Sequence, residues 1–161
     1  IEFFRTTPPL VQLFWFFFAL PILIDVRMTP FIAAIVTFSI QSSAFFAEVF
    51  RGGILSIDKG QWEAGKAIGM NYPQTLRRII LPVAIKRVLP ALTNRGIEVF
   101  KMSTLASVVA YVETLNQAKL IADLNFNPIE SYTAVAVMFF AVLYPVVQAT
   151  YVLERRLRRS D

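Results

Sequence analysis

Apolar residues gather in four stretches of this chain, and polar residues gather between them. The stretches cover about residues 8–24, 31–50, 90–112 and 131–153. A helix needs about 20 predominantly apolar residues to cross a bilayer. The second stretch has this length, the fourth exceeds it without a single charge, and the first suffices for a tilted span that includes Pro8 and Pro9. The pattern therefore predicts an all-α polytopic membrane protein with four spans.

The third stretch carries more polar residues than the others. Residues 83–115 read as one long helix that Pro90 interrupts, polar as far as Arg95 and apolar afterwards. Arg95, Glu98 and Lys101 are three positions apart and alternate in sign. Side chains at this spacing are neighbours on a helix, so ion pairs between them would lower the cost of placing charge at membrane depth.

The longest polar segment, residues 54–82, is called the elbow below, and its centre predicts two short helices. Gly69 stands where the first helix would end, because glycine tolerates a positive φ. Asn71 is a suitable cap for the second helix, with Pro73 in its first turn. Pro82 lacks a backbone donor, so we expect the second helix to stop near Leu81.

Composition supports the membrane interpretation and excludes several chemistries. Hydrophobic residues are 56% of the chain and the mean hydropathy is +0.57. The 16 Lys and Arg residues are clustered, which favours a membrane protein over a nucleic-acid binder. The chain has no Cys and no His, so disulfides, Cys/His metal sites, Cys nucleophiles and Ser-His-Asp triads are excluded. We expect no cofactor.

The basic residues predict the orientation of the chain. Four crossings place both termini and the elbow on one side, where 12 basic residues gather, while Arg27 and Lys119 lie on the other side. Short loops rich in Lys and Arg stay cytoplasmic, so the elbow is expected in the cytoplasm. The arginines of residues 154–159 follow the last span directly and are expected to anchor it to lipid headgroups.

The elbow also carries a motif. Glu63-Ala64-Gly65 is followed after three residues by Gly69, and after nine more by Ile79-x-Leu81-Pro82. This pattern resembles the EAA loop of bacterial ABC importer permeases, whose consensus is E-A-A-x3-G-x9-I-x-L-P. Nearly the whole chain resembles one branch, the polar amino-acid importer permeases. The supporting runs are Arg5–Leu13, Ala47–Ile54 and Ser56–Ala64.

The resemblance implies a MetI-like transmembrane helix bundle in the bacterial inner membrane, in a chain that lacks its N-terminal span. It implies three kinds of partner: ABC ATPase subunits, a second permease subunit and an extracytoplasmic solute-binding protein. The amino-acid substrate would cross by alternating access. The residues carried over as contacts of the ATPase are Glu63, Ala64, Gly65, Gly69, Ile79, Leu81 and Pro82. Gly65 replaces the second alanine of the consensus and is also small.

Polar residues at membrane depth are the candidates for the substrate pathway. Thr37, Gln41 and Glu48 share one face of the second span, which predicts a face turned toward a water-filled path or toward packing partners. Glu98, Lys101 and Ser103 are the candidates in the third span. Two positions depart from the family pattern: Met102 follows Lys101 where the family commonly has Asp, and Gln41 stands where Asn is common.

The energy for transport has to come from elsewhere. The chain has no G-x-x-x-x-G-K-[ST] loop, so it is not expected to bind ATP or to be an enzyme. Asp58 and Glu63 are five positions apart in a solvated segment and form no catalytic pair. The alternatives are a channel or assembly subunit without an ATPase and, more remotely, a soluble helical enzyme.

Overall fold

The computed structural model describes the chain from residue 1 to residue 158, and its side chains as far as Arg155. This part of the chain is helical and contains no strand. Of the predicted basic end, Arg159 and the side chains of Arg156 and Arg158 lie outside the described residues. The elements are α1 (Glu2–Thr6), α2 (Pro9–Phe14), the π-helical η1 (Trp15–Ala19), α3 (Leu20–Ile24), α4 (Pro30–Leu55), α5 (Lys59–Ala67), α6 (Tyr72–Thr75), the π-helical η2 (Leu76–Ile80), α7 (Leu81–Met102), the 3₁₀-helical η3 (Ser103–Val109), α8 (Thr114–Asn125) and α9 (Pro128–Arg158).

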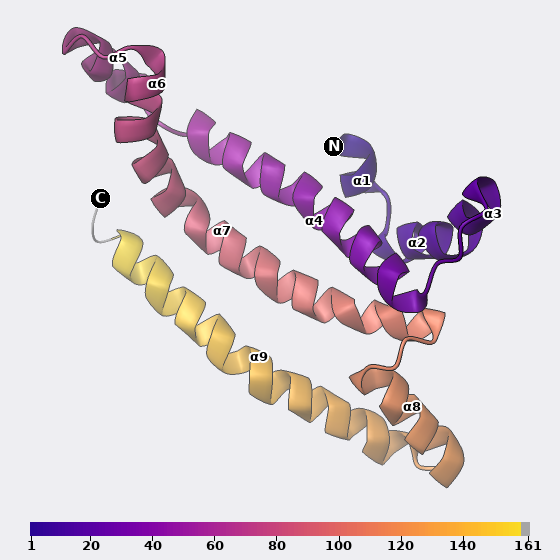
Figure 1. Ribbon diagram of the computed structural model, residues 1–161. Helices are drawn as coiled ribbons and strands as arrows, with labels where there is room; N and C mark the ends of the chain where they lie inside the picture. The colour runs from indigo at the N-terminus through magenta and orange to yellow at the C-terminus, as the bar shows by residue number, and fades with distance from the viewer. Residues whose placement is uncertain (159–161) are drawn as a thin grey trace.

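Three long helices, α4, α7 and α9, lie side by side in that order (Figure 1). The elbow forms one end of the α4–α7 pair, and α8 packs on α9 at the opposite end. Helices α1 and α2 pack on α4. This arrangement places α4 and α7 on either side of one shared space, with the elbow joining them.

Two helices are long and apolar enough to cross a membrane by length and composition. They are α4, with 26 residues and a mean hydropathy of 1.5, and residues 128–155 of α9, with a mean hydropathy of 1.9. The apolar helix from Pro9 to Ile24 is shorter. Both long helices extend beyond the predicted spans, and the third predicted span corresponds to the second half of α7 together with η3. The division into four spans remains a prediction.

The expected stop at Pro82 is wrong, because the helix runs without a break from α6 through η2 into α7. The Leu81 N–H bonds to the Leu76 carbonyl, five residues back, and Pro82 follows in the first turn of α7. The Leu20 N–H likewise bonds to the Trp15 carbonyl just before Pro21. A π turn widens the backbone where a proline ring would otherwise crowd the preceding turn, so the helix continues.

The expected interruption at Pro90 is also wrong, because α7 continues through this residue. Near the proline, the Thr93 hydroxyl donates to the carbonyls of Pro90 (2.8 Å) and Leu89 (3.1 Å). These bonds strengthen the turn that follows Pro90, whereas the carbonyl that loses its backbone donor is that of Lys86, four residues before the proline.

The boundaries predicted at Gly69 and Asn71 are confirmed. Gly69 ends α5 with a φ of +78°. The Met70 N–H bonds to the Gly65 carbonyl and the Gly69 N–H to the Lys66 carbonyl, the pair of bonds that defines a Schellman motif. Asn71 caps α6 through a capping box with Gln74, whose two hydrogen bonds both measure 3.0 Å.

Two small apolar clusters fix the ends of the α4–α7 pair. At the end away from the elbow, Leu13 of α2 packs with residues of α4 and η3. At the elbow, Ile57, Ile80 and Ala84 form the second cluster. Close by, Gly53 of α4 lies directly against Val88 of α7, so the two helices cross at short range.

Candidate functional site

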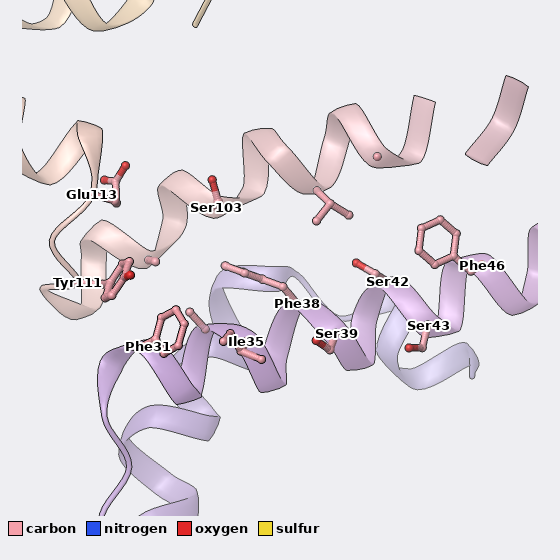
Figure 2. A pocket seen from close by; sticks show the side chains of 14 residues that line it. Phe31, Ile35, Phe38, Ser39, Ser42, Ser43, Phe46, Ser103, Tyr111 and Glu113 are labelled. Carbon is pink, nitrogen blue, oxygen red and sulfur yellow. The ribbon is translucent and has the colours of Figure 1, made fainter. Parts of the chain in front are cut away.

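A groove of about 660 Å³ lies between α4 on one side and α7, η3 and the loop before α8 on the other. Its walls are mostly apolar, with hydroxyl groups at intervals. Figure 2 shows the side chains of Phe38, Ser42 and Phe46 on the face of α4 that looks toward α7. Phe31 and Tyr111 stack at one end, with ring centroids 5.5 Å apart. We call this space the α4–α7 groove.

Ser42 is the one buried polar residue among the described residues that line the groove. The residue is 7% exposed, and its hydroxyl has no hydrogen-bond partner. Two other polar groups of the groove are engaged: the Ser103 hydroxyl donates to the Phe100 carbonyl at 2.7 Å, and the Glu113 carboxylate accepts two backbone N–H groups at the start of α8. A buried, unpaired hydroxyl is costly unless something else satisfies it.

Of the six residues predicted for the substrate pathway, Ser103 lines the groove. Thr37 is fully buried and donates to the carbonyl of Ala33 in its own helix, at 2.7 Å. Gln41 is 2% exposed, does not line the groove, and has a side-chain oxygen without a partner. Lys101 is exposed and lies outside the groove.

The two predicted carboxylates pair with arginines. Glu48 bonds to Arg51 one turn away and lies 3.5 Å from Arg5 of α1. Glu98 pairs with Arg95 at 2.7 Å, which confirms the ion pair expected from their spacing. Among the residues with described side chains, Lys101 forms no ion pair.

The face of α4 that was predicted from the sequence differs by about one residue from the face that lines the groove. Thr37 and Gln41 lie next to Phe38 and Ser42, and one residue rotates a helix position by about 100°. The missed signal is a row of groove residues at helical spacing: Phe31, Ile35, Phe38, Ser42 and Phe46. Aromatic residues in this row look like lipid-facing positions in the sequence.

The elbow is a closely packed unit. Gly65 of α5 is buried against Thr75, and an added Cβ would lie 2.5 Å from Thr75 Cγ2 and 2.7 Å from its Oγ1. The rings of Trp62 and Tyr72 stack, with centroids 5.4 Å apart and planes 15° apart. Arg87 of α7 also donates to the Ser56 carbonyl at 2.5 Å. The elbow is therefore held to both groove helices.

Of the residues predicted to contact an ATPase, five are exposed and two face inward. Glu63, Ala64 and Gly69 are exposed on the α5 side of the elbow, beside Ile68, which is 68% exposed. Leu81 and Pro82 are exposed in the first turn of α7. Gly65 and Ile79 instead face inward, the first against Thr75 and the second against the Ile57 cluster.

Sequence comparison places the chain among transport proteins. Residues 1–159 match the family described as binding-protein-dependent transport system inner membrane component. The chain is 41% identical over 159 residues to the glutamine transport system permease protein GlnP of Escherichia coli (strain K12), covering 98% of this chain and 73% of that protein. It is 38% identical over 156 residues to the L-cystine transport system permease protein TcyB of Bacillus subtilis (strain 168), covering 96% of this chain and 66% of that protein.

Solved structures agree with the sequence comparison. The crystal structure of an amino acid ABC transporter with histidines superposes with a TM-score of 0.90 at 34% identity, over 96% of this chain and 72% of that one. The MetNI methionine ABC transporter, in inward-facing conformations, superposes with a TM-score of 0.70 at 19% identity, over 94% of this chain and 71% of that one. The second likeness concerns the fold alone.

Proposed function

The chain belongs to the family of binding-protein-dependent transport system inner membrane components, and we propose that it is the permease subunit of an ABC importer that takes up polar or charged amino acids. One observation carries the proposal: the elbow is built directly onto the two helices that line the groove. A subunit of this kind breaks no covalent bond in its substrate. Its place is the bacterial inner membrane, which it crosses several times.

The connection between elbow and groove is covalent on both sides. Helix α4 leads into α5 through residues 56–58, and α6 continues through η2 into α7 without a break. The Gly65–Thr75 contact holds α5 to α6, so the elbow moves as one body. A displacement of the elbow therefore changes how α4 and α7 lie against each other, which is the requirement for alternating access.

The displacement would come from separate ATPase subunits. The exposed side of the elbow offers Glu63, Ala64, Ile68 and Gly69, a small surface with charged and apolar character. An amphipathic helix of this kind fits a groove on a partner protein. The inward-facing Gly65 and Ile79 shape that surface from behind, while Leu81 and Pro82 border it on α7.

The substrate would pass along the α4–α7 groove. Ser42 offers its unpaired hydroxyl on the α4 side, and Ser103 retains acceptor capacity on the opposite side. Gln41, with an unpaired side-chain oxygen one position away, would enter the path if α4 rotates during the cycle. Thr37, Glu48 and Glu98 act as packing and charge-pairing residues around the path rather than as contacts of the amino acid, and the exposed Lys101 lies outside the groove.

The remaining partners follow from the same proposal. A second permease subunit, identical or different, completes the pathway, and a solute-binding protein delivers the amino acid from outside. Helix α9 carries no charge between residues 131 and 153, and only 11% of its most apolar window is buried, so lipid and the second subunit are suitable neighbours. No nucleic acid is involved.

Uptake into vesicles tests the proposal. The chain is co-expressed with its ATPase and its solute-binding protein, reconstituted, and supplied with a labelled amino acid. We expect uptake that requires both ATP and the binding protein. Uptake or ionic conductance that is independent of ATP would instead establish the channel alternative.

A further inference from the structure

Arg95 is a buried arginine that the proposed pathway does not use. It lies in the middle of α7 and is only 8% exposed. Its guanidinium pairs with Glu98 at 2.7 Å, and Nη2 lies 4.0 Å from the Met102 sulfur, while Nε has no partner. Burying a guanidinium is expensive, and Glu98 compensates for it incompletely because the side chain of Glu98 is 60% exposed.

The remaining contact of Arg95 is an aromatic ring on the neighbouring helix. Its Cζ atom lies 3.9 Å from the centroid of the Phe45 ring of α4. The Cζ atom of Arg5, from α1, lies 5.6 Å from the centroid of the same ring. A cation is attracted to the face of an aromatic ring, and the attraction grows when water is excluded. Phe45 therefore links α1, α4 and α7, three elements distant in sequence (Figure 1).

Carboxylates on both sides balance the two cations. Glu48 lies 3.5 Å from Arg5, and Glu98 lies 2.7 Å from Arg95. Arg51 also pairs with Glu48, and Glu2 lies 3.7 Å from Arg5. Three arginines therefore meet three glutamates, and the two arginines share one ring without a net positive charge in the cluster. The chain of contacts runs from α7 through α4 to α1.

The position of Arg95 connects this cluster to the groove. Gly96, the next residue, lines both the α4–α7 groove and a second cavity between α7 and α9. Val99 and Ser103 of the same helical segment also line the groove. The rotation of α7 about its own axis at Arg95 thus determines where the residues on the α7 side of the groove lie.

We propose that Arg5, Phe45 and Arg95 form a clamp that holds α7 in one rotational setting against α4 and α1, and that Arg95 is a positioning residue for transport. The clamp rests on the proposed transport function. It is built to be released, because a ring and a half-exposed carboxylate hold the buried guanidinium less firmly than an enclosed ion pair would. The strength of the clamp determines how much amino acid is transported for each ATP hydrolysed.

Stepwise fluorination of Phe45 tests the clamp. Fluorine withdraws electron density from the ring face and weakens cation binding with little change in ring size. Mono-, di- and trifluorophenylalanine are incorporated at position 45 of the complete transporter, and the amino acid transported per ATP hydrolysed is measured in vesicles. We expect the ratio to fall with each fluorine, by about fivefold for the trifluoro ring, with unchanged yield of assembled complex. Phe45→Tyr should retain the ratio, and Phe45→Leu should lose it.

Phe50 supplies the matched control, because it lies on the same helix and forms no cation–π or ring–ring pair among the described residues. The same fluorinated series at Phe50 should leave the ratio unchanged. A ratio that is constant across the Phe45 series, or that falls equally in both series, would overturn the clamp while leaving the transport function intact. Absence of ATP-dependent uptake with unmodified Phe45 would instead refute the proposed function, and the clamp with it.

Discussion

Gly65 lies so close to Thr75 that a Cβ atom on the glycine would come within 2.5 Å of Thr75 Cγ2. The two residues belong to different helices of the elbow, α5 and α6. Contact at this range leaves no room for independent movement of the two helices. The elbow can therefore transmit a displacement to α4 and α7 rather than absorb it.

Gly65→Ala should loosen the elbow. Alanine is the better helix former by up to about 1 kcal/mol, but its methyl group has to displace Thr75, and overpacking costs about 1–3 kcal/mol. We expect faster proteolysis between α5 and α6 in the purified transporter. Thr75→Ala in the same chain removes both clashing atoms and should restore protection.

Gly60→Ala is the control, because nothing lies within 4 Å of a Cβ at that position of α5. It should leave proteolysis unchanged or slow it slightly. Equal proteolysis of the Gly65 and Gly60 variants would show that the contact does not hold the elbow closed.

A second close approach predicts a stability change in the helix pair. Gly53→Ala places a methyl group directly against Val88, where α4 crosses α7, whereas Gly52→Ala meets nothing within 4 Å. We expect the first variant to be about 1–3 kcal/mol less stable and the second to be near neutral, as measured by thermal unfolding in detergent. Identical melting temperatures would mean that the crossing is wider than described.

The exposed side of the elbow predicts the binding of the ATPase. Ala64→Asp introduces a charge into the centre of the proposed contact, next to Glu63, and should weaken binding of the ATPase at least about tenfold. Co-purification of the ATPase with the permease in detergent measures this binding. Gln61→Ala alters an exposed residue outside the predicted contact set and should bind normally. Normal binding by Ala64→Asp would mean that the ATPase docks elsewhere.

The unpaired hydroxyl in the groove predicts a change in substrate affinity. Ser42→Ala removes one potential hydrogen bond, which is worth about 0.5–1.5 kcal/mol, so the KM for uptake should rise about two- to tenfold. The change in kcat should be smaller. Thr133→Ala, at an exposed position of α9, should leave KM unchanged. An unaltered KM in Ser42→Ala would remove this residue from the pathway.

Local signals in the sequence predicted the elbow well. The cap at Asn71 and the turn at Gly69 depend on residues within one or two turns, and both were confirmed. The ion pair between Arg95 and Glu98 was likewise predictable from a spacing of three. Such features require no knowledge of the neighbouring helices.

Features that depend on neighbours were not predictable from the sequence. Pro82 was expected to end a helix, but a π turn before it lets the helix continue. Thr37 was expected on a face turned toward a path or toward packing partners; it is fully buried and bonds to its own backbone, and the adjacent face of α4 lines the groove. The contact of Phe45 with Arg5 and Arg95 joins residues 40 and 50 positions apart in the chain, beyond any periodic pattern.

The central claim is that ATP hydrolysis on a partner reaches the α4–α7 groove through the elbow. The most direct measurement replaces residues 63–69 with an Ala/Ser sequence of the same length and follows ATP-driven amino-acid uptake in vesicles. The account predicts that uptake is lost while the chain stays inserted in the membrane and the ATPase subunits still hydrolyse ATP. Undiminished ATP-driven uptake by this variant would contradict the account.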